Sequence, residues 1–362
     1  MTIAVVIQSL VMARGGAERF THNLLRGLVQ RAHDVSVLCH EWDDGAAALP
    51  IERIRVPRAR GWRHPWRAFS DAVWQALGRA RRHDVVLGLT QLCPQDVHRF
   101  GGGVYRYWFE RKYGRCLPLH LLRPHVRQAL AFERAMYTPG NYRHLIAISE
   151  MDRQLLLRYY DVPPERVHTV YNGFDMEEFH ARDRADARAE LCAMHAIPPE
   201  RTVVLFAANN YERKGLPQAI EALLHTRDPR RFALVVIGKA HAHVARALRQ
   251  RCARRLQHIW LDRVPNPAAF YRGADFLVFP TLYDSFANVI GEALCCGLPV
   301  ITTRQAGGAE MIKPGVNGYV VAHAGAHEEL RDACEALGDR ERCASFSAHA
   351  RDVVGALTIE RC

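Results

Sequence analysis

The sequence predicts an α/β protein made of two doubly wound domains, and three observations lead to this prediction. The chain has 362 residues, which is too long for one ordinary core and suits two domains of similar size. Short apolar runs alternate with helix-patterned segments, as in parallel strands joined by crossover helices. The same alternation starts again in the second half of the chain.

In the first half, five apolar runs are expected to be strands and one amphipathic segment is expected to be the first helix. This helix is predicted over 17–31, where Phe20, Leu24, Leu25 and Leu28 share one face. The expected strands are 3–8, 34–40, 51–56, 84–89 and 144–149.

The second half repeats the pattern after a join near 171–200, where a charged stretch and a Pro-Pro pair suggest a linker. Its expected strands are 202–208, 232–238, 258–262, 275–280 and 299–303, with the clearest helices at 220–225 and 287–297. The predicted domains are 1–170 and 171–345, followed by a C-terminal helix over 346–362 that crosses back to the first domain. Ligands of such folds bind outside the carboxyl ends of the strands, here in a cleft between the domains.

Composition and charge narrow the class of protein. The chain is 49% hydrophobic and 24% charged, which is typical of a globular protein and excludes a disordered one. Its net charge of +11 indicates an anionic partner, and nucleic acid, acidic lipid and a phosphorylated substrate all fit.

The sequence lacks the signals of a secreted, membrane-spanning or metal-binding protein. The first 16 residues lack the basic start and cleavage site of a secretory signal, and no apolar run reaches the ~20 residues that span a bilayer. The ten cysteines include no CxxC pair or zinc spacing, so reduced thiols in a cytoplasm are expected. No Asp-x-Asp triplet occurs, which disfavours a metal-bridged ligand.

The first candidate site feature is the pair Gly15 and Gly16, between the first strand and the first helix. Paired glycines let backbone approach a ligand closely, and a helix N-terminus favours anions. The pair matches neither a dinucleotide fingerprint nor a P-loop, so an ordinary strand-to-helix turn is an equally good interpretation.

The second feature is the adjacent cations Arg213 and Lys214, just after the first strand of the second domain. Two cations at a strand's carboxyl end can clamp a diphosphate and stabilise the charge that grows on it as it leaves. A surface loop that is simply basic is the alternative, and the position at a strand end favours function.

The third feature is the segment from Asp284 to Glu292, where a loop leads from one strand into an apolar helix. Carboxylates accept pairs of hydrogen bonds from neighbouring hydroxyls, so the two acids could hold a hexose and a ribose. Solvated helix carboxylates are the alternative, which fits Glu292 poorly because Ile290, Ala293 and Leu294 surround it in the sequence.

A basic aromatic segment occupies 105–137. It combines aromatic residues with cations, a mixture that suits the headgroup layer of an anionic membrane. A solvated basic helix with core aromatics and a nucleic-acid patch are the alternatives, and no nucleic-acid motif supports the latter. The residues concerned are Tyr105, Arg106, Tyr107, Trp108, Phe109, Arg111, Lys112, Tyr113, Arg115, Arg123 and Arg127.

Over nearly its whole length the chain resembles glycosyltransferase family 4, whose GT-B fold has two Rossmann-like doubly wound domains facing across a cleft. Within the family, AFERAMYTPG at 131–140 and ERKGLPQAIEAL at 212–223 are most similar to the lipopolysaccharide core glucosyltransferases. The segments that carry the family resemblance are GGAERF at 15–20, YNGFD at 171–175, ERKG at 212–215, the run at 271–303, GGAEMI at 307–312 and GVNGYVV at 315–321.

The resemblance implies a retaining, metal-independent hexosyltransferase that moves glucose from UDP-glucose to a heptose of the lipopolysaccharide inner core. It implies an acceptor-binding first domain, a donor-binding second domain and no cofactor beside the UDP-sugar substrate. The implied address is the cytoplasmic face of the inner membrane, with peripheral attachment to its anionic surface and no nucleic-acid partner.

The resemblance also assigns residues. It implies that Gly15 and Gly16 lie against the donor, Arg213 and Lys214 bind the diphosphate, Arg263 and Val264 lie by the nucleobase, Asp284, Ser285, Phe286 and Ala287 bind the sugar, and Glu292 binds the ribose. Arg213, Lys214 and Asp284 are the implied catalytic residues. The implied mechanism is departure and attack on one face of the sugar, with the leaving phosphate taking the acceptor proton.

Two positions depart from the family pattern. Asp284 stands where family members carry Glu, which leaves the identity of the donor sugar open. The usual histidine of the first domain is not fixed by a motif. His98 is the candidate for a sugar contact, Asp96 is the alternative, and a structural histidine is a third interpretation.

Three other functions compete with this one. The first is a family 4 enzyme with another donor or acceptor, such as an exopolysaccharide or lipid-linked sugar. The second is a non-hydrolysing nucleotide-sugar epimerase, which the loop at 280–297 argues against. The third is a non-catalytic protein that binds nucleotide sugar or a lipid surface, which the intact cations and acids disfavour.

Overall fold

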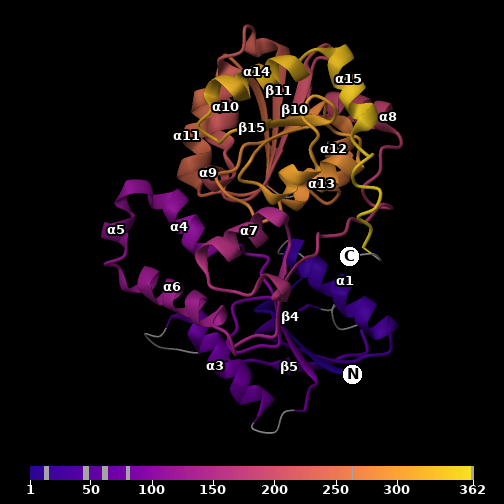
Figure 1. Ribbon diagram of the computed structural model, residues 1–362. Coiled ribbons are helices and arrows are strands. Elements are labelled where there is room, and N and C mark those ends of the chain that lie inside the picture. Colours follow the sequence, from indigo (N-terminus) through magenta and orange to yellow (C-terminus); the bar gives the residue numbers. More distant parts are fainter. Residues whose placement is uncertain (12–15, 44–48, 59–63, 79–81, 263, 360–362) are drawn as a thin grey trace. The chain divides into compact units, whose positions relative to one another are not determined.

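The computed structural model describes residues 1–11, 16–43, 49–58, 64–78, 82–262 and 264–359 (Figure 1). The chain divides into two compact units, Met1–Asn172 and Gly173–Cys362. Each unit has its own parallel sheet covered by helices, so the predicted α/β class and the two doubly wound sheets are confirmed.

The first unit is built on a seven-stranded parallel sheet with the order β5-β3-β1-β6-β7-β8-β9. Its strands are β1 (Thr2–Val6), β3 (Asp34–Cys39), β5 (Glu52–Arg55), β6 (Val85–Gly88), β7 (Val97–Arg99), β8 (His144–Ala147) and β9 (Val167–Thr169), and a separate pair is β2 (Ser9–Leu10) with β4 (Glu41–Trp42). Its helices are α1 (Gly16–Gln30), α3 (Pro65–Leu77), α4 (Tyr105–Tyr113), α5 (Leu117–His120), α6 (Pro124–Met136) and α7 (Glu150–Tyr159).

Strand β1 shows why this sheet needs helices on both faces. Successive side chains of a strand point to opposite faces. Val5 packs in one apolar cluster with Leu25 of α1, whereas Val6 packs in another with Phe69 of α3. A strand buried on both faces reads as a continuous apolar run, which is how the sequence predicted it.

The second unit has a six-stranded parallel sheet with the order β12-β11-β10-β13-β14-β15. Its strands are β10 (Thr202–Ala207), β11 (Phe232–Ile237), β12 (Gln257–Leu261), β13 (Phe276–Phe279), β14 (Val300–Thr303) and β15 (Gly318–Val321). Its helices are α8 (Arg184–Met194), α9 (Tyr211–Lys214), α10 (Leu216–Leu224), α11 (Ala242–Cys252), α12 (Pro267–Gly273), α13 (Asn288–Cys295), α14 (His327–Leu337) and α15 (Arg340–His349).

Both sheets reverse their order beside the first strand of the unit. The switch lies between β1 and β6 in the first sheet and between β10 and β13 in the second. Crossover connections leave such a point toward opposite faces of the sheet, which opens a crevice at the carboxyl ends of the two strands. The loops after β10 and β13 carry the predicted basic pair and Asp284, so the topology brings these residues to one edge.

The stretch that was expected to be a linker is an integral helix of the second unit. The guanidinium of Arg184 in α8 donates to the Cys296 carbonyl at 2.9 Å and to the Ala274 carbonyl at 3.0 Å. Arg188 pairs with Asp275 at 2.7 Å. The charges that resembled a solvated linker therefore satisfy carbonyl groups at the ends of neighbouring elements.

The C-terminal segment also differs from expectation. Helix α15 ends at His349, and the residues from Ala350 to Gly355 form turns rather than a helix over 346–362. Two adjacent β-branched valines and Gly355 disfavour further helix. The segment then lies along the start of its own unit, where Phe174 N donates to the Leu357 carbonyl at 2.9 Å.

Candidate active site

The loop after β10 holds the basic pair against the loop after β13. The Asn210 side chain caps α9 by accepting from Arg213 N at 3.3 Å. Gly215 follows with φ +82°, and a Cβ there would lie 1.9 Å from the Pro280 carbonyl oxygen. Glycine therefore permits a close approach that any side chain would block, and Lys214 is placed beside the second loop.

Lys214 and Asp284 form an ion pair across the two loops. Asp284 Oδ1 also accepts from the backbone N–H groups of Phe286 and Ala287 at 3.3 and 3.0 Å. Burial by itself raises the pKa of Asp284, but the ammonium of Lys214, the charge of Arg213 and the Phe286 N–H outweigh it, so the pKa lies below its usual range. Asp284 is therefore an ionised hydrogen-bond acceptor at neutral pH.

Arg213 ties the same two loops together. Its Nε donates to the Tyr283 carbonyl at 3.2 Å, and its own carbonyl accepts from Leu282 N at 2.9 Å. The guanidinium is thus fixed at the carboxyl end of the switch-point strands, where an anionic ligand would be expected.

The turn into α13 is compact and strained. Ala287, the N-cap residue of α13, has φ +64°, a left-handed conformation that costs a non-glycine residue about 1–3 kcal/mol and often accompanies function. Ser285 is 3% exposed, and its Oγ has no hydrogen-bond partner among the described residues. Glu292, on α13, accepts from the Tyr271 hydroxyl at 2.8 Å.

The structure brings Arg213, Lys214 and Asp284 into one cluster. The other donor residues implied by the sequence lie on separate elements: Gly16 begins α1, and Val264 is half-buried after β12. Gly15 and Arg263 lie outside the residues that the structure describes.

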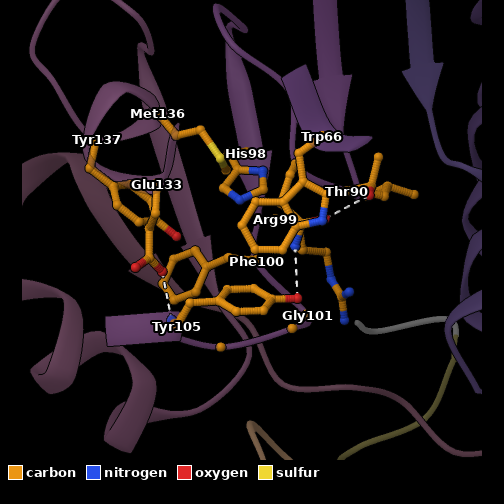
Figure 2. A pocket seen from close by; sticks show the side chains of 14 residues that line it. Trp66, Thr90, His98, Arg99, Phe100, Gly101, Tyr105, Glu133, Met136 and Tyr137 are labelled. Carbon is orange, nitrogen blue, oxygen red and sulfur yellow. Dashed lines mark hydrogen bonds between the residues drawn. The ribbon is translucent and has the colours of Figure 1, made fainter. Parts of the chain in front are cut away.

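A small pocket lies at the carboxyl ends of β6 and β7 in the first unit (Figure 2). Its walls include Trp66, Phe100, Tyr105 and Tyr137, with His98 among them. Aromatic walls with a few polar groups are typical of small-molecule sites.

His98 is a neutral side chain in this pocket. It is 2% exposed, and its Nδ1 lies 3.2 Å from the Gly88 carbonyl oxygen. Because a carbonyl oxygen can only accept, Nδ1 carries the proton and Nε2 is an acceptor. Burial lowers the pKa of His98 to about 4, and the charge of Arg99 acts in the same direction. His98 can therefore accept a hydrogen bond from a hydroxyl group at neutral pH.

Asp96, the alternative to His98, lies at the opposite end of β7. Its Oδ2 accepts from Val86 N at 2.8 Å, and its Oδ1 pairs with Arg143 Nε at 3.1 Å. These contacts join strand β6 to the start of β8 at the amino edge of the sheet, away from the edge where ligands bind. The geometry therefore favours His98 over Asp96 as a ligand contact.

Sequence reasoning missed Glu133, which is 2% exposed in the wall of the pocket. Its carboxylate accepts from Tyr105 N at 2.6 Å and Arg106 N at 3.0 Å, so it caps α4, and it also accepts from the Tyr160 hydroxyl. Burial raises the pKa of Glu133 to about 7 despite these donors. The sequence does carry a signal for the burial of Glu133: it follows Val126 by seven residues and so falls on the apolar stripe of α6.

No metal ligand set is apparent in the described ranges, where no three His, Cys, Asp or Glu side chains gather as a metal would require. The same part of the chain contains no helix with the length and apolar character needed to cross a bilayer.

Comparison with known families identifies the class of protein. Residues 14–178 match the model of Glycosyltransferase Family 4, and residues 201–339 match that of Glycosyl transferases group 1. The chain belongs to this family of retaining GT-B glycosyltransferases, which confirms the family and the fold that the sequence suggested.

Two relatives cover most of the chain. Lipopolysaccharide glucosyltransferase WaaG of Escherichia coli is 24% identical over 88% of this chain and 84% of its own. A probable transglycosylase of Burkholderia thailandensis is 29% identical over 87% of this chain and 80% of its own.

Solved structures of relatives share the fold. A crystal structure of WaaG, described as involved in lipopolysaccharide biosynthesis, superposes with a TM-score of 0.85 at 22% identity over 98% of this chain and 97% of that one. Anabaena HepE in complex with UDP-glucose superposes with a TM-score of 0.74 at 17% identity over 99% of this chain and 96% of that one.

Proposed function

We propose that this family 4 glycosyltransferase moves glucose from UDP-glucose to a heptose of the lipopolysaccharide inner core, with retention of configuration. The observation that carries the proposal is the cluster of Arg213, Lys214 and Asp284 at the switch-point edge of the second sheet. The similarity to WaaG supports the acceptor, and the HepE complex supports UDP-glucose as the donor.

In this proposal the two cations act on the leaving group. Breaking the glycosidic bond places negative charge on the UDP, and Arg213 and Lys214 stabilise that charge more than the ground state. The diphosphate oxygen takes the proton of the acceptor hydroxyl as that hydroxyl attacks from the same face. The reaction then needs no metal ion for charge neutralisation.

The remaining residues hold the substrates. Asp284 is an ionised acceptor for hexose hydroxyls, together with the tight turn Ser285–Ala287, and Glu292 binds the ribose. Donor contacts by Gly15 and Gly16 and base contacts by Arg263 and Val264, which the family resemblance implies, remain part of the proposal. His98 contributes Nε2 as an acceptor for a sugar hydroxyl.

The core oligosaccharide of a strain that lacks this gene tests the proposal. Mass spectrometry should show loss of the first hexose and of everything attached beyond it, and plasmid expression of the wild-type chain should restore both. A core that keeps every hexose contradicts the acceptor, and loss of a different sugar points to another family 4 donor.

We further propose that the segment 105–137 docks the first unit on an anionic membrane. Helices α4, α5 and α6 form it, with α5 outermost in Figure 1. Leu119 and Leu122 are 68% and 74% exposed, and the cations Arg111, Lys112, Arg115, Arg123 and Arg127 are exposed near them in sequence. Exposed apolar side chains among cations suit the headgroup layer.

Sedimentation with vesicles checks this docking. The wild-type chain should bind vesicles that contain anionic phospholipid and not neutral ones. Leu119→Ser with Leu122→Ser should weaken binding about tenfold or more, because two buried leucines stabilise an interface by a few kcal/mol. Met194→Ser, which changes a 64% exposed apolar residue elsewhere, is the matched control and should bind normally. Equal binding by all three proteins would contradict the proposal.

A further inference from the structure

Arg99 is a buried cation that has no acidic partner among the described residues of its own unit. It ends β7, is 9% exposed and lines the same pocket as His98. Its Nη2 donates to the neutral amide oxygen of Asn172, and its guanidinium lies 3.5 Å from the centre of the Phe20 ring. Within the described residues of this unit, no carboxylate pairs with it and no second hydrogen bond from it is recorded.

A buried, unpaired guanidinium lowers the stability of the folded protein unless a ligand supplies the missing anion. Buried arginines are almost always paired, because removing a charge from water without compensation costs several kcal/mol. Burial lowers the pKa of Arg99 to about 9, which still leaves the side chain protonated at neutral pH. Of the five guanidinium N–H donors, one is used by Asn172, so the others can meet an incoming acceptor.

The glycine run 101–103 beside Arg99 leaves room for a ligand to reach the guanidinium. Figure 2 shows the guanidinium beside Gly101, and a Cβ at Gly101 would lie 3.4 Å from Arg99 Nη1. A side chain at that position would therefore cover the nitrogen that faces the pocket. The Phe20 ring contacts the guanidinium carbon of Arg99 at 3.5 Å from the ring centre and restrains the side chain, while the remaining N–H groups can bind a planar or tetrahedral oxyanion.

We propose that Arg99 binds an anionic group, a phosphate or a carboxylate, of the acceptor sugar chain. This inference rests on the proposed function, because it names the chemistry of the acceptor that reaches His98. The aromatic walls from Trp66, Tyr105 and Tyr137 favour the sugar-bearing substrate over the donor's diphosphate, which already has two cations at Arg213 and Lys214.

Steady-state kinetics of Arg99→Gln tests the proposal with UDP-glucose and isolated inner-core acceptor. The KM for the acceptor should rise about 10- to 100-fold, the range expected for a lost hydrogen bond to a charge, while the KM for UDP-glucose changes less than about twofold. Arg166→Gln, which alters an exposed arginine of the same unit, is the matched control. A rise in the KM for UDP-glucose, or no change in either constant, would overturn the proposal.

Modified acceptors identify the anion. Phosphatase treatment or amidation of carboxylates should raise the KM of the wild-type enzyme as much as Arg99→Gln does, and the treatment that does so should have no further effect on the variant. If neither treatment changes the wild-type KM, the proposal fails.

Two further measurements test the anion site without relying on the Arg99→Gln variant alone or on transfer activity. Gly101→Ala keeps Arg99 and a permitted backbone, so it should raise the acceptor KM even if Arg99→Gln does not fold. Inorganic phosphate should raise the thermal midpoint of the wild-type chain more than that of Arg99→Gln, a readout that needs no transfer. If the wild-type chain transfers no glucose but shows this difference with phosphate, the proposed function fails and the anion site stands. If phosphate shifts the midpoints of the wild-type chain and Arg99→Gln equally, the anion site itself is contradicted.

Discussion

Replacing Lys214 with alanine is expected to reduce kcat/KM with UDP-glucose about 10²- to 10³-fold, the loss seen when one charge-stabilising donor is removed from a reaction. The change removes a cation from the leaving diphosphate and also leaves the inward-facing Asp284 without its ion-pair partner. The pKa of Asp284 should then rise toward its ordinary value, because the ammonium that lowers it is gone.

Initial rates at saturating acceptor measure this effect, and thermal unfolding of the variant shows whether the fold is kept. Lys313→Ala removes an exposed lysine of the same unit and should have wild-type kinetics. A double variant with Asp284→Ala should lose less than the product of the two single losses, because the pair acts as one unit. Wild-type turnover by Lys214→Ala would remove this residue from the mechanism.

The second large effect concerns pH and stability in the first unit, where two buried groups act in opposite directions. The pKa of Glu133 rises from its ordinary value near 4.5 to about 7, so the folded state keeps a proton that the unfolded state loses, and stability falls as pH rises from about 4.5 to 7. The pKa of His98 falls from 6.5 to about 4, so the unfolded state binds the extra proton, and stability rises with pH from about 4 to 6.5. In the wild-type chain the two contributions largely cancel.

Replacing His98 or Glu133 singly should reveal the pH dependence of the free energy of unfolding that comes from the other residue. The reference is the double variant that combines His98→Gln with Glu133→Gln and so lacks both buried groups. Relative to it, the free energy of unfolding of His98→Gln should fall by about 3 kcal/mol between pH 4.5 and 7, and that of Glu133→Gln should rise by a similar amount between pH 4 and 6.5. Denaturant titrations followed by tryptophan fluorescence report this unit, because five of the six tryptophans precede residue 172. If both variants keep the pH profile of the double variant, the two side chains titrate normally in the folded protein.

The sequence predicted the sheets well because buried parallel strands are visible as apolar runs. Strand β10 is buried at all six positions, so neither polar alternation nor a turn signal obscures it. Strands β7 and β9 were missed because each has only three residues and includes a histidine, so their pairing with β8 decides their structure.

The candidate site was only partly predictable. The basic pair and Asp284 could be placed after strands, but their ion pair joins residues 70 positions apart and depends on the closeness that Gly215 permits. The pocket of the first unit was not predicted, because Glu133 and Arg99 reach it from a helix and a strand whose packing no local pattern reveals. The linker was misjudged for the same reason, since the carbonyl partners of Arg184 lie about 90 residues away or more.

The direct test of the proposed reaction is transfer from UDP-glucose to isolated inner-core acceptor, run either with chelator or with added Mg²⁺, with the product analysed by NMR. We expect a glucosylated heptose whose new linkage keeps the α configuration of the donor, formed at the same rate with chelator and with added Mg²⁺. Binding of UDP-glucose without transfer, or a product with inverted configuration, would contradict it.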